Sequence, residues 1–273
     1  MDAGTFDAAA RVLDVTPSAV SQRIKALEQE LGRVLVVRSR PVALTDSGAV
    51  LVRLARQQAT LEDAAAVDLG GSGLPRAIPI AVNADSMATW LLPAVAASGI
   101  LVEFHRDDQE HTVDLLADGT VMAAVTSRAE SVPGCFTTAL GTVRYRAVAA
   151  PAYVEKWFPD GVDADSLAVA PVIDFDRKDE LQSRWLRSRT RRELAPPRHL
   201  IPASADFARA VHLGMGWGML PDAQLGANLV ELGGDPIDVP LYWQQWNLRT
   251  PTLETLREVV SAAASRLTAR PAP

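Results

Sequence analysis

The sequence predicts an α/β protein in three parts: an N-terminal winged helix-turn-helix, a long linker helix, and a two-lobed α/β body. Three observations support this prediction. Two short helices joined by a tight turn open the chain, a glycine-rich segment at 70–75 interrupts it, and strands alternate with helices from residue 78 onward. A length of 273 residues fits two or three domains.

The composition is that of an ordinary soluble protein, with 48% hydrophobic and 22% charged residues. No apolar run is long enough to span a bilayer, and no basic-then-apolar signal segment opens the chain. The single cysteine, Cys135, excludes an internal disulfide and has no Cys or His neighbour at metal-ligand spacing. We therefore expect a cytoplasmic protein with no membrane partner, metal or other cofactor.

Charge is distributed unevenly, although the net charge is −6. Residues 1–60 carry eight basic and six acidic side chains, whereas residues 61–273 carry 19 basic and 27 acidic ones. A mildly basic head on an acidic body fits a DNA-contacting module joined to one that does not touch DNA. The basic excess in the head is small enough to arise by chance, so charge alone does not decide.

The second predicted helix begins at Thr16 and Pro17, which are typical N-cap and first-turn residue types. Apolar residues recur at steps of four, three and four, so one face consists of Val20, Ile24, Leu27 and Leu31. The opposite, polar face consists of Ser18, Gln22, Lys25 and Gln29. Such a face can read bases and phosphates in a major groove, although an ordinary surface helix has the same pattern.

Before this helix, residues 6–13 form a short alanine-rich helical run, and Asp14-Val15 is a tight connection, which together indicate a helix-turn-helix. After it, residues 34–38 and 42–44 are two short strands around a turn at 39–41, which would form the wing. Arg38 and Arg40 lie near its tip. They either contact DNA phosphates or the minor groove, or remain solvated hairpin charges.

Thr45 then caps a long helix that runs to about Leu69. A coiled-coil-like seam repeats along it at Leu51, Leu54, Gln58, Leu61 and Ala65. Gln58 is polar and weakens the seam. The glycines of 70–75, followed by Pro75, mark a linker after this helix.

Beyond the linker, strands alternate with helices, which implies a mainly parallel sheet. The first set comprises strands at 78–82, 100–105 and 122–126 and helices at 86–97 and 112–117. The second set follows a strand at 145–149 and comprises helices at 152–158, 178–190 and 205–213 and strands at 171–175 and 217–220. A strand at 240–243 and a helix at 251–268 return to the first lobe.

Four runs in the head (residues 4–10, 15–21, 24–28 and 31–32) resemble the DNA-binding domain of LysR-type transcriptional regulators. The body resembles the lysine- and arginine-responsive ArgP/LysG branch of that family, at 81–93 and in shorter runs at 133–135, 158–162, 171–176 and 241–243. The resemblance implies a winged helix-turn-helix at 1–45, a dimerisation helix at 46–70 and a periplasmic-binding-protein-like effector domain at 71–273. Lobe one of this domain would comprise residues of about 76–149 and 240–273, and lobe two residues of about 150–239.

The resemblance also implies a homodimer or homotetramer that binds double-stranded promoter DNA, responds to a basic amino acid and controls an amino-acid exporter gene. Family members usually have another helix before the position of Gly4. We therefore expect exposed apolar surface around Ala9, Val12 and Val20. The alternative is an amino-acid-binding protein whose DNA-binding head is impaired.

A strand ends and a helix begins at Asp85-Ser86, where helix N–H groups and the carboxyl ends of strands favour an anionic ligand group. Ser86 could equally be a simple helix cap. A side-chain cation would need carboxylates, and the candidates are Asp85, Asp107, Asp108, Asp174, Asp176, Asp179 and Asp206. Each of them could also be a solvated or capping carboxylate.

Two sets of candidate residues result. The DNA-binding set is Thr16, Pro17, Ser18, Ser21, Gln22, Lys25, Arg38 and Arg40. The effector-binding set is Asp85, Ser86, Trp90, Thr126, Asp176, Asp179 and Asp206. An enzyme is not expected, because the four histidines lack metal spacing, no Gly-x-Ser-x-Gly elbow occurs, and the glycines at 214, 216 and 218 follow a helix rather than a strand.

Overall fold

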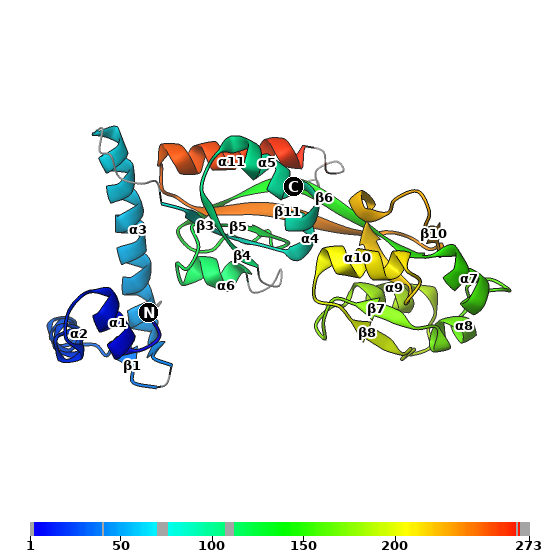
Figure 1. Ribbon diagram of the computed structural model, residues 1–273, viewed down its shortest axis with the longest axis horizontal. Helices are drawn as coiled ribbons and strands as arrows, with labels where there is room; N and C mark the ends of the chain where they lie inside the picture. The colour runs from blue at the N-terminus through cyan, green and yellow to red at the C-terminus, as the bar shows by residue number, and fades with distance from the viewer. Residues whose placement is uncertain (1–2, 40, 70–75, 107–111, 266, 268–273) are drawn as a thin grey trace.

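The computed structural model describes residues 3–39, 41–69, 76–106, 112–265 and 267. Figure 1 shows three parts: a small helical head, the long helix α3 (Asp46–Asp68) that rises from it, and a two-lobed body beside α3. Arg40, Asp107 and Asp108 lie outside the described residues. Within the described part, no helix is long and apolar enough to cross a bilayer.

The head contains the predicted helix-turn-helix and wing. Helices α1 (Phe6–Val12) and α2 (Pro17–Leu31) are joined by a turn in which Asp14 has a φ of 52°. Thr16 caps α2, because its Oγ1 accepts the N–H of Ala19 at 3.2 Å. The wing is the antiparallel pair β1 (Val36–Val37) and β2 (Ala43–Leu44).

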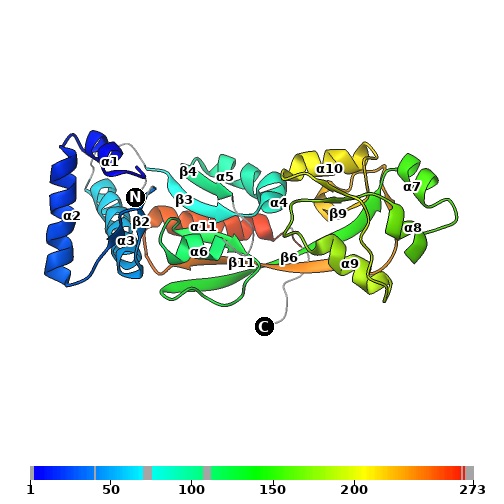
Figure 2. The same ribbon diagram turned by 90° about the horizontal axis from the view of Figure 1, so that it is seen from below.

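The apolar face expected along α2 is only partly covered. Val20 is buried and Ile24 is half-buried, but Leu27 and Leu31 are 42% and 44% exposed. These two leucines are exposed because the short helix α1 lies beside only one end of α2 (Figure 2).

The apolar surface around α1, which we expected to be exposed, is only partly exposed. Val12 is 79% exposed, as expected, and Ala9 is half-buried. Val20 is buried at 8% exposure, contrary to expectation. Ala10 is buried as well, which indicates that α1 and α2 cover each other at their crossing.

Helix α3 has one face on lobe one and one face in solvent. Thr45 caps it, with its Oγ1 accepting the N–H of Gly48 at 3.1 Å. On the body side, Arg53 Nη1 donates to the carbonyl of Ala117 at 3.2 Å. Four residues of the predicted seam are exposed on the other side, namely Leu54, Gln58, Leu61 and Ala65. Val50, which was not part of the predicted seam, is exposed there too. Leu51 is half-buried and departs from the predicted seam.

A single seven-stranded sheet runs through the body, with two long strands at its centre. Strands β6 (Cys135–Ala149) and β11 (Ile237–Trp246) pair antiparallel along their length. In lobe one, β11 pairs antiparallel with β5 (Ala123–Thr126), and β3 (Ile78–Val82) lies parallel between β5 and β4 (Val102–Arg106). In lobe two, β6 pairs antiparallel with β9 (Gly218–Pro221) and β10 (Val230–Glu231).

The expectation of a mainly parallel sheet is therefore wrong. Both β6 and β11 are much longer than predicted, because each passes from one lobe into the other and takes antiparallel partners in both. The two crossings expected between the lobes are these two strands, as Figures 1 and 2 show. Among the described residues, parallel pairing is confined to β3, β4 and β5 in lobe one and, in lobe two, to a small sheet and a single bridge between Val172 and Trp217.

Lobe one is layered. Helices α5 (Leu92–Ser98) and α11 (Pro251–Ala264) lie on one face of the sheet and α6 (Thr112–Ala117) on the other (Figure 1). Val95 and Leu256 are buried against the first face, and Leu116 and Trp246 against the second. Burial on both faces explains why β5 is entirely apolar except for its last residue, Thr126.

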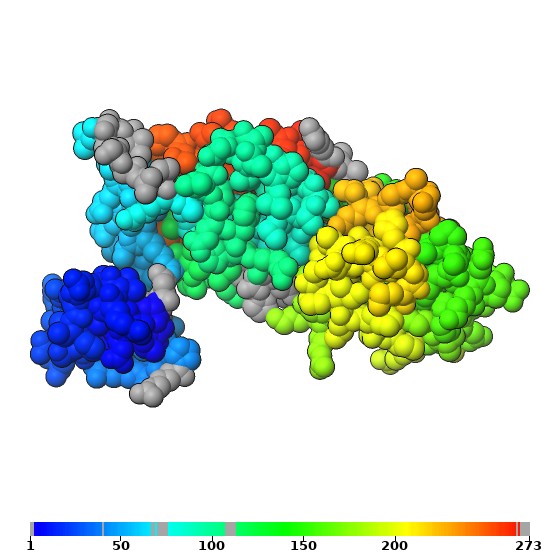
Figure 3. All heavy atoms as spheres, viewed as in Figure 1, coloured from blue at the N-terminus to red at the C-terminus, as the bar shows by residue number. Residues whose placement is uncertain are grey.

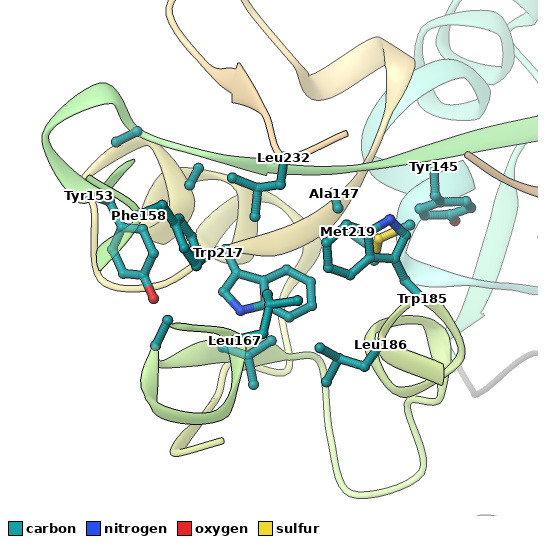
Figure 4. Packing of buried hydrophobic residues seen from close by; sticks show 14 of the residues in the cluster. Tyr145, Ala147, Tyr153, Phe158, Leu167, Trp185, Leu186, Trp217, Met219 and Leu232 are labelled. Atoms are coloured by element: carbon teal, nitrogen blue, oxygen red, sulfur yellow. The ribbon is translucent and has the colours of Figure 1, made fainter. Parts of the chain in front are cut away.

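Lobe two is built on a core rich in aromatic residues (Figure 4), in which Trp185 and Trp217 are tilted with ring centroids 5.0 Å apart. Its elements are α7 (Pro151–Trp157), α8 (Ala164–Val169), β7 (Val172–Asp174), α9 (Leu181–Arg189), β8 (Arg198–Leu200) and α10 (Ser204–His212). The short elements α8 and β8 were not predicted. Gly216 is a close-packing glycine, since an added Cβ would lie 2.8 Å from Ile173 Cγ1.

Candidate functional site

The junction between the lobes begins where β3 ends. Residues 84–98 form one helical stretch: α4 (Ala84–Ser86), a π-helical turn η1 (Met87–Leu91) and α5. The cap is Asn83 and not Ser86, because Asn83 Oδ1 accepts the N–H of Ser86 at 3.0 Å. Ser86 is 1% exposed, and its Oγ has no hydrogen-bond partner among the described residues.

Tyr145 connects the two lobes at this point. Its hydroxyl donates to Asp85 Oδ2 at 2.7 Å, while its ring is buried in the core of lobe two (Figure 4). Burial raises the pKa of Tyr145 well above its ordinary value, and the nearby charges of Asp85 and Asp179 raise it further. The hydroxyl therefore remains a hydrogen-bond donor to a carboxylate of lobe one and lies within the electrostatic influence of a carboxylate of lobe two.

Lobe two presents a carboxylate-rich loop after β7. Asp174 is 3% exposed, and its Oδ2 is paired with Arg198. Asp176 Oδ1 accepts the N–H groups of Lys178 at 2.7 Å and Asp179 at 3.1 Å. Asp174 Oδ1 is buried and has no hydrogen-bond partner in the part of the chain that the structure describes.

Asp179 is held at the base of this loop. It accepts the N–H groups of Phe175 at 2.9 Å and Leu181 at 3.0 Å. Burial raises the pKa of Asp179, and the same cause raises the pKa of Asp174, because a carboxylate loses hydration inside the protein. Burial therefore disfavours the charged form of both carboxyl groups unless a cation pairs with them, and a ligand cation on the lobe-two side of the junction would supply that pairing.

The other predicted effector residues lie in several places. Thr126 is fully buried at the end of β5, where its Oγ1 accepts the N–H of Arg128 at 3.2 Å. Asp206 is exposed in the first turn of α10. Figure 3 shows the atoms of α10, in yellow, directly against those of lobe one.

Trp90 lies in a different environment from Asp85 and Ser86. Its ring lines a groove of about 700 Å³ that is bordered by α5, α11, residues 142–144 and residues 221–223. Asp85, Ser86 and Asp179 are not among the described residues that line this groove. The structure therefore brings Asp85, Ser86 and Asp179 to one junction and separates Trp90 from them.

Sequence reasoning did not identify Tyr145. It appeared only as the first residue of a strand, and no pattern connects it with Asp85, which lies 60 positions earlier. Gln182 was also missed. It is buried in α9 and donates from Nε2 to the carbonyl of Ile173 at 3.0 Å, next to the acidic loop.

The candidate DNA-binding residues divide into exposed and occupied groups. Ser18, Gln22 and Lys25 are exposed along α2, and Ser21 is half-buried. Thr16 and Pro17 form the start of the helix, where the Thr16 hydroxyl also lies 3.0 Å from that of Ser18. Arg38 is exposed on the wing and stacks over the ring of Phe6, with 5.9 Å between its Cζ and the ring centroid.

Both parts of the chain match known families. Residues 1–49 match the bacterial regulatory helix-turn-helix proteins of the lysR family, and residues 72–265 match the LysR substrate binding domain. The HTH-type transcriptional regulator LysG of Mycobacterium tuberculosis is 44% identical and spans 98% of this chain and 91% of its own length. The lysine export transcriptional regulatory protein LysG of Corynebacterium glutamicum is 39% identical over 97% of this chain and 94% of its own length.

Solved structures give the same result. The crystal structure of ArgP from Mycobacterium tuberculosis has a TM-score of 0.88 at 44% identity, covering 97% of this chain and 94% of that one. Full-length LysG from Corynebacterium glutamicum with bound effector Arg has a TM-score of 0.81 at 36% identity, covering 98% and 95%. The chain therefore belongs to the LysR family, whose members are DNA-binding transcriptional regulators and not enzymes.

Proposed function

We propose that this regulator binds a basic amino acid, lysine or arginine, at the junction between its lobes and controls an exporter gene for basic amino acids. The observation that carries the proposal is the set of carboxylates that the fold brings to this junction from both lobes. Two relatives support it by name: one is a lysine export regulator, and another was solved with arginine bound.

The electrostatics favour a cationic side chain on the lobe-two side. Asp174 and Asp179 are buried carboxylates whose pKa values are raised by burial, and Arg198 is the cation paired with Asp174 in the described structure. An ammonium or guanidinium group near Asp176 and Asp179 would compensate this negative charge in a partly dry environment. A neutral side chain would leave the charge uncompensated.

The opposite end of the ligand would meet lobe one. Its α-carboxylate would accept a hydrogen bond from the unpartnered hydroxyl of Ser86 at the start of the 84–98 helical stretch. A buried hydroxyl without a partner is disfavoured, so a ligand acceptor would satisfy a group that the protein alone leaves unmet.

The head and linker helix supply the DNA-binding half of the function. The exposed side chains of Gln22 and Lys25 lie on α2, where they can reach base edges and phosphates in a major groove. The exposed stripe on α3 would pair with the same stripe of a second copy, bringing two recognition helices to two half-sites of promoter DNA.

Isothermal titration calorimetry with lysine, arginine, leucine and phenylalanine tests the effector. We expect lysine or arginine to bind far more tightly than leucine or phenylalanine. At least one of Asp176→Asn, Asp179→Asn and Asp206→Asn should weaken that binding about thirtyfold, by removing one partner from a charged hydrogen bond. Asp235→Asn, which makes the same change at an exposed lobe-two position, is the matched control. Leucine binding as tight as lysine, or normal binding by all three variants, would refute the proposal.

A further inference from the structure

We propose that Asp85, held in place by the hydroxyl of Tyr145, receives the α-ammonium group of the effector. Asp85 then makes a free α-amino group a requirement for binding, and Tyr145 is a positioning residue for that recognition. This inference rests on the proposed function, because it assumes that an amino acid binds at the junction, and it adds which group of the amino acid lobe one selects.

Two side chains with opposite hydrogen-bonding preferences are adjacent at the start of the 84–98 helical stretch. Asp85 is a charged acceptor and Ser86 a neutral donor, and both belong to the three-residue segment that Asn83 caps. The α-ammonium and α-carboxylate of an amino acid are attached to the same carbon. A ligand whose carboxylate meets the unpartnered Ser86 hydroxyl therefore brings its α-ammonium close to the neighbouring carboxylate.

Asp85 is held by a single neutral donor among the described residues. Tyr145 donates to Oδ2 at 2.7 Å, whereas Oδ1 has no partner among the residues that the structure describes. A tyrosine hydroxyl is neutral, so this bond orients the carboxylate without cancelling its charge. An arginine in the same place would have neutralised it. The carboxylate is thus both oriented and available to a cation.

The donor, Tyr145, is itself held firmly in lobe two. The ring of Tyr145 is 2% exposed and is packed in the lobe-two core that contains Trp185 and Met219 (Figure 4). Its strand, β6, is fixed by antiparallel pairing with β11 and β9. The position of the hydroxyl is therefore set by lobe two while its acceptor belongs to lobe one, so Asp85 is oriented only when the lobes are correctly placed.

Lysine and 6-aminohexanoate isolate the group in question, because 6-aminohexanoate keeps the carboxylate and the distal ammonium and lacks only the α-ammonium. Calorimetric titration should show that the unmodified protein binds lysine at least about thirtyfold more tightly than 6-aminohexanoate. Asp85→Asn should bring the two affinities to within about threefold of each other by weakening lysine alone. Tyr145→Phe should weaken lysine about fivefold and leave 6-aminohexanoate unchanged.

Tyr153→Phe is the matched control for Tyr145→Phe. It removes another buried lobe-two hydroxyl, one that donates to the carbonyl of Pro171 at 2.5 Å and is not bonded to Asp85. Its ratio of lysine to 6-aminohexanoate affinity should equal that of the unmodified protein. This ratio does not change when a variant only lowers the folded fraction, so it separates positioning from a general loss of stability.

Two results would overturn the assignment of Asp85 to the α-ammonium group and leave the proposed function intact. One is equal affinity of the unmodified protein for lysine and 6-aminohexanoate, and the other is equal weakening of both ligands by Asp85→Asn. Failure of the unmodified protein to bind any of the amino acids would overturn the proposed function and this assignment with it. The comparison of lysine with 6-aminohexanoate on the unmodified chain needs no variant, so the test holds even if Asp85→Asn does not fold.

Discussion

Gly119 lies at the contact between the linker helix and lobe one, and Gly119→Ala should perturb this contact directly. Gly119 has a φ of +78°, and an added Cβ would lie 2.9 Å from Arg53 Cα and 2.9 Å from ring carbons of Trp246. Arg56 Nη1 donates to Thr120 Oγ1 at 3.1 Å beside it. Trp246 is buried and α3 is not covered on its outer side, so relief of the clash requires α3 to move.

The expected magnitude has two parts. A residue other than glycine at this φ costs about 1 kcal/mol, and overpacking against backbone and a buried ring costs about 1–3 kcal/mol. Gly119→Ala should therefore lower the free energy of unfolding by about 2–4 kcal/mol. Gly134 is a matched control, with a φ of +86° and no heavy atom within 4 Å of an added Cβ. Gly134→Ala should lose only the first part, about 1 kcal/mol.

Urea unfolding measures both losses, and amide hydrogen exchange locates them. We expect residues 50–66 of α3 to exchange faster in Gly119→Ala than in the unmodified protein or in Gly134→Ala, because the helix is displaced from lobe one. Equal losses of stability in the two variants, with no change in α3 exchange, would show that Gly119 does not hold this contact.

Four further predictions follow from the described contacts. Gln22→Ala should reduce the preference for promoter DNA over random DNA by about 1–3 kcal/mol. Lys25→Ala should weaken binding to all DNA and reduce its salt dependence. Fluorescence anisotropy on promoter and random duplexes measures both effects, and equal losses on the two duplexes for Gln22→Ala would contradict the assignment. Ser86→Ala should weaken lysine binding by only about 1 kcal/mol, because the chain retains other donors there. Burial raises the pKa of Cys135 to about 12 from 9.0, so alkylation followed by mass spectrometry at pH 8 should be about a thousandfold slower than for a free thiol. The pKa of Asp179 is raised, so this carboxylate is protonated at a higher pH than an exposed aspartate. As the pH is lowered, lysine affinity should therefore begin to fall at that higher pH. Calorimetry at several pH values should show that Asp179→Asn lacks this part of the pH dependence.

Local signals in the sequence predicted what local contacts decide. The cap at Thr16, the cap at Thr45 and the Asp14 turn all depend on residues within four positions of one another. The start of the helix after β3 was misplaced for the same kind of reason. Asn83 and Ser86 are both good caps, and the sequence alone does not show that Asn83 Oδ1 takes the N–H of Ser86.

Long-range partners account for what the sequence did not predict. The lengths of β6 and β11 follow from their pairing with each other across about 100 positions, which no local period encodes. The exposure of Leu27 depends on how far α1 reaches along α2. The contact between Tyr145 and Asp85 arises only once β6 has crossed between the lobes, so the carboxylates could be proposed but not the group that holds them.

Strand β5 runs from the contact with the linker helix to the end of β3, beside the junction where we propose that the effector binds, so we propose that it couples the two. At its start, Met122 Sδ accepts a hydrogen bond from Thr60 of α3 at 3.5 Å, and at its end lies Thr126. All of β5 is buried and held between β3 and β11, so it moves as a close-packed unit. We therefore expect Gly119→Ala to reduce the change in DNA affinity that lysine causes. Because linkage is reciprocal, the effect of DNA on lysine affinity should fall by the same factor, which calorimetry checks. If lysine changes the DNA affinity of Gly119→Ala as much as that of the unmodified protein in anisotropy, this route of coupling is ruled out.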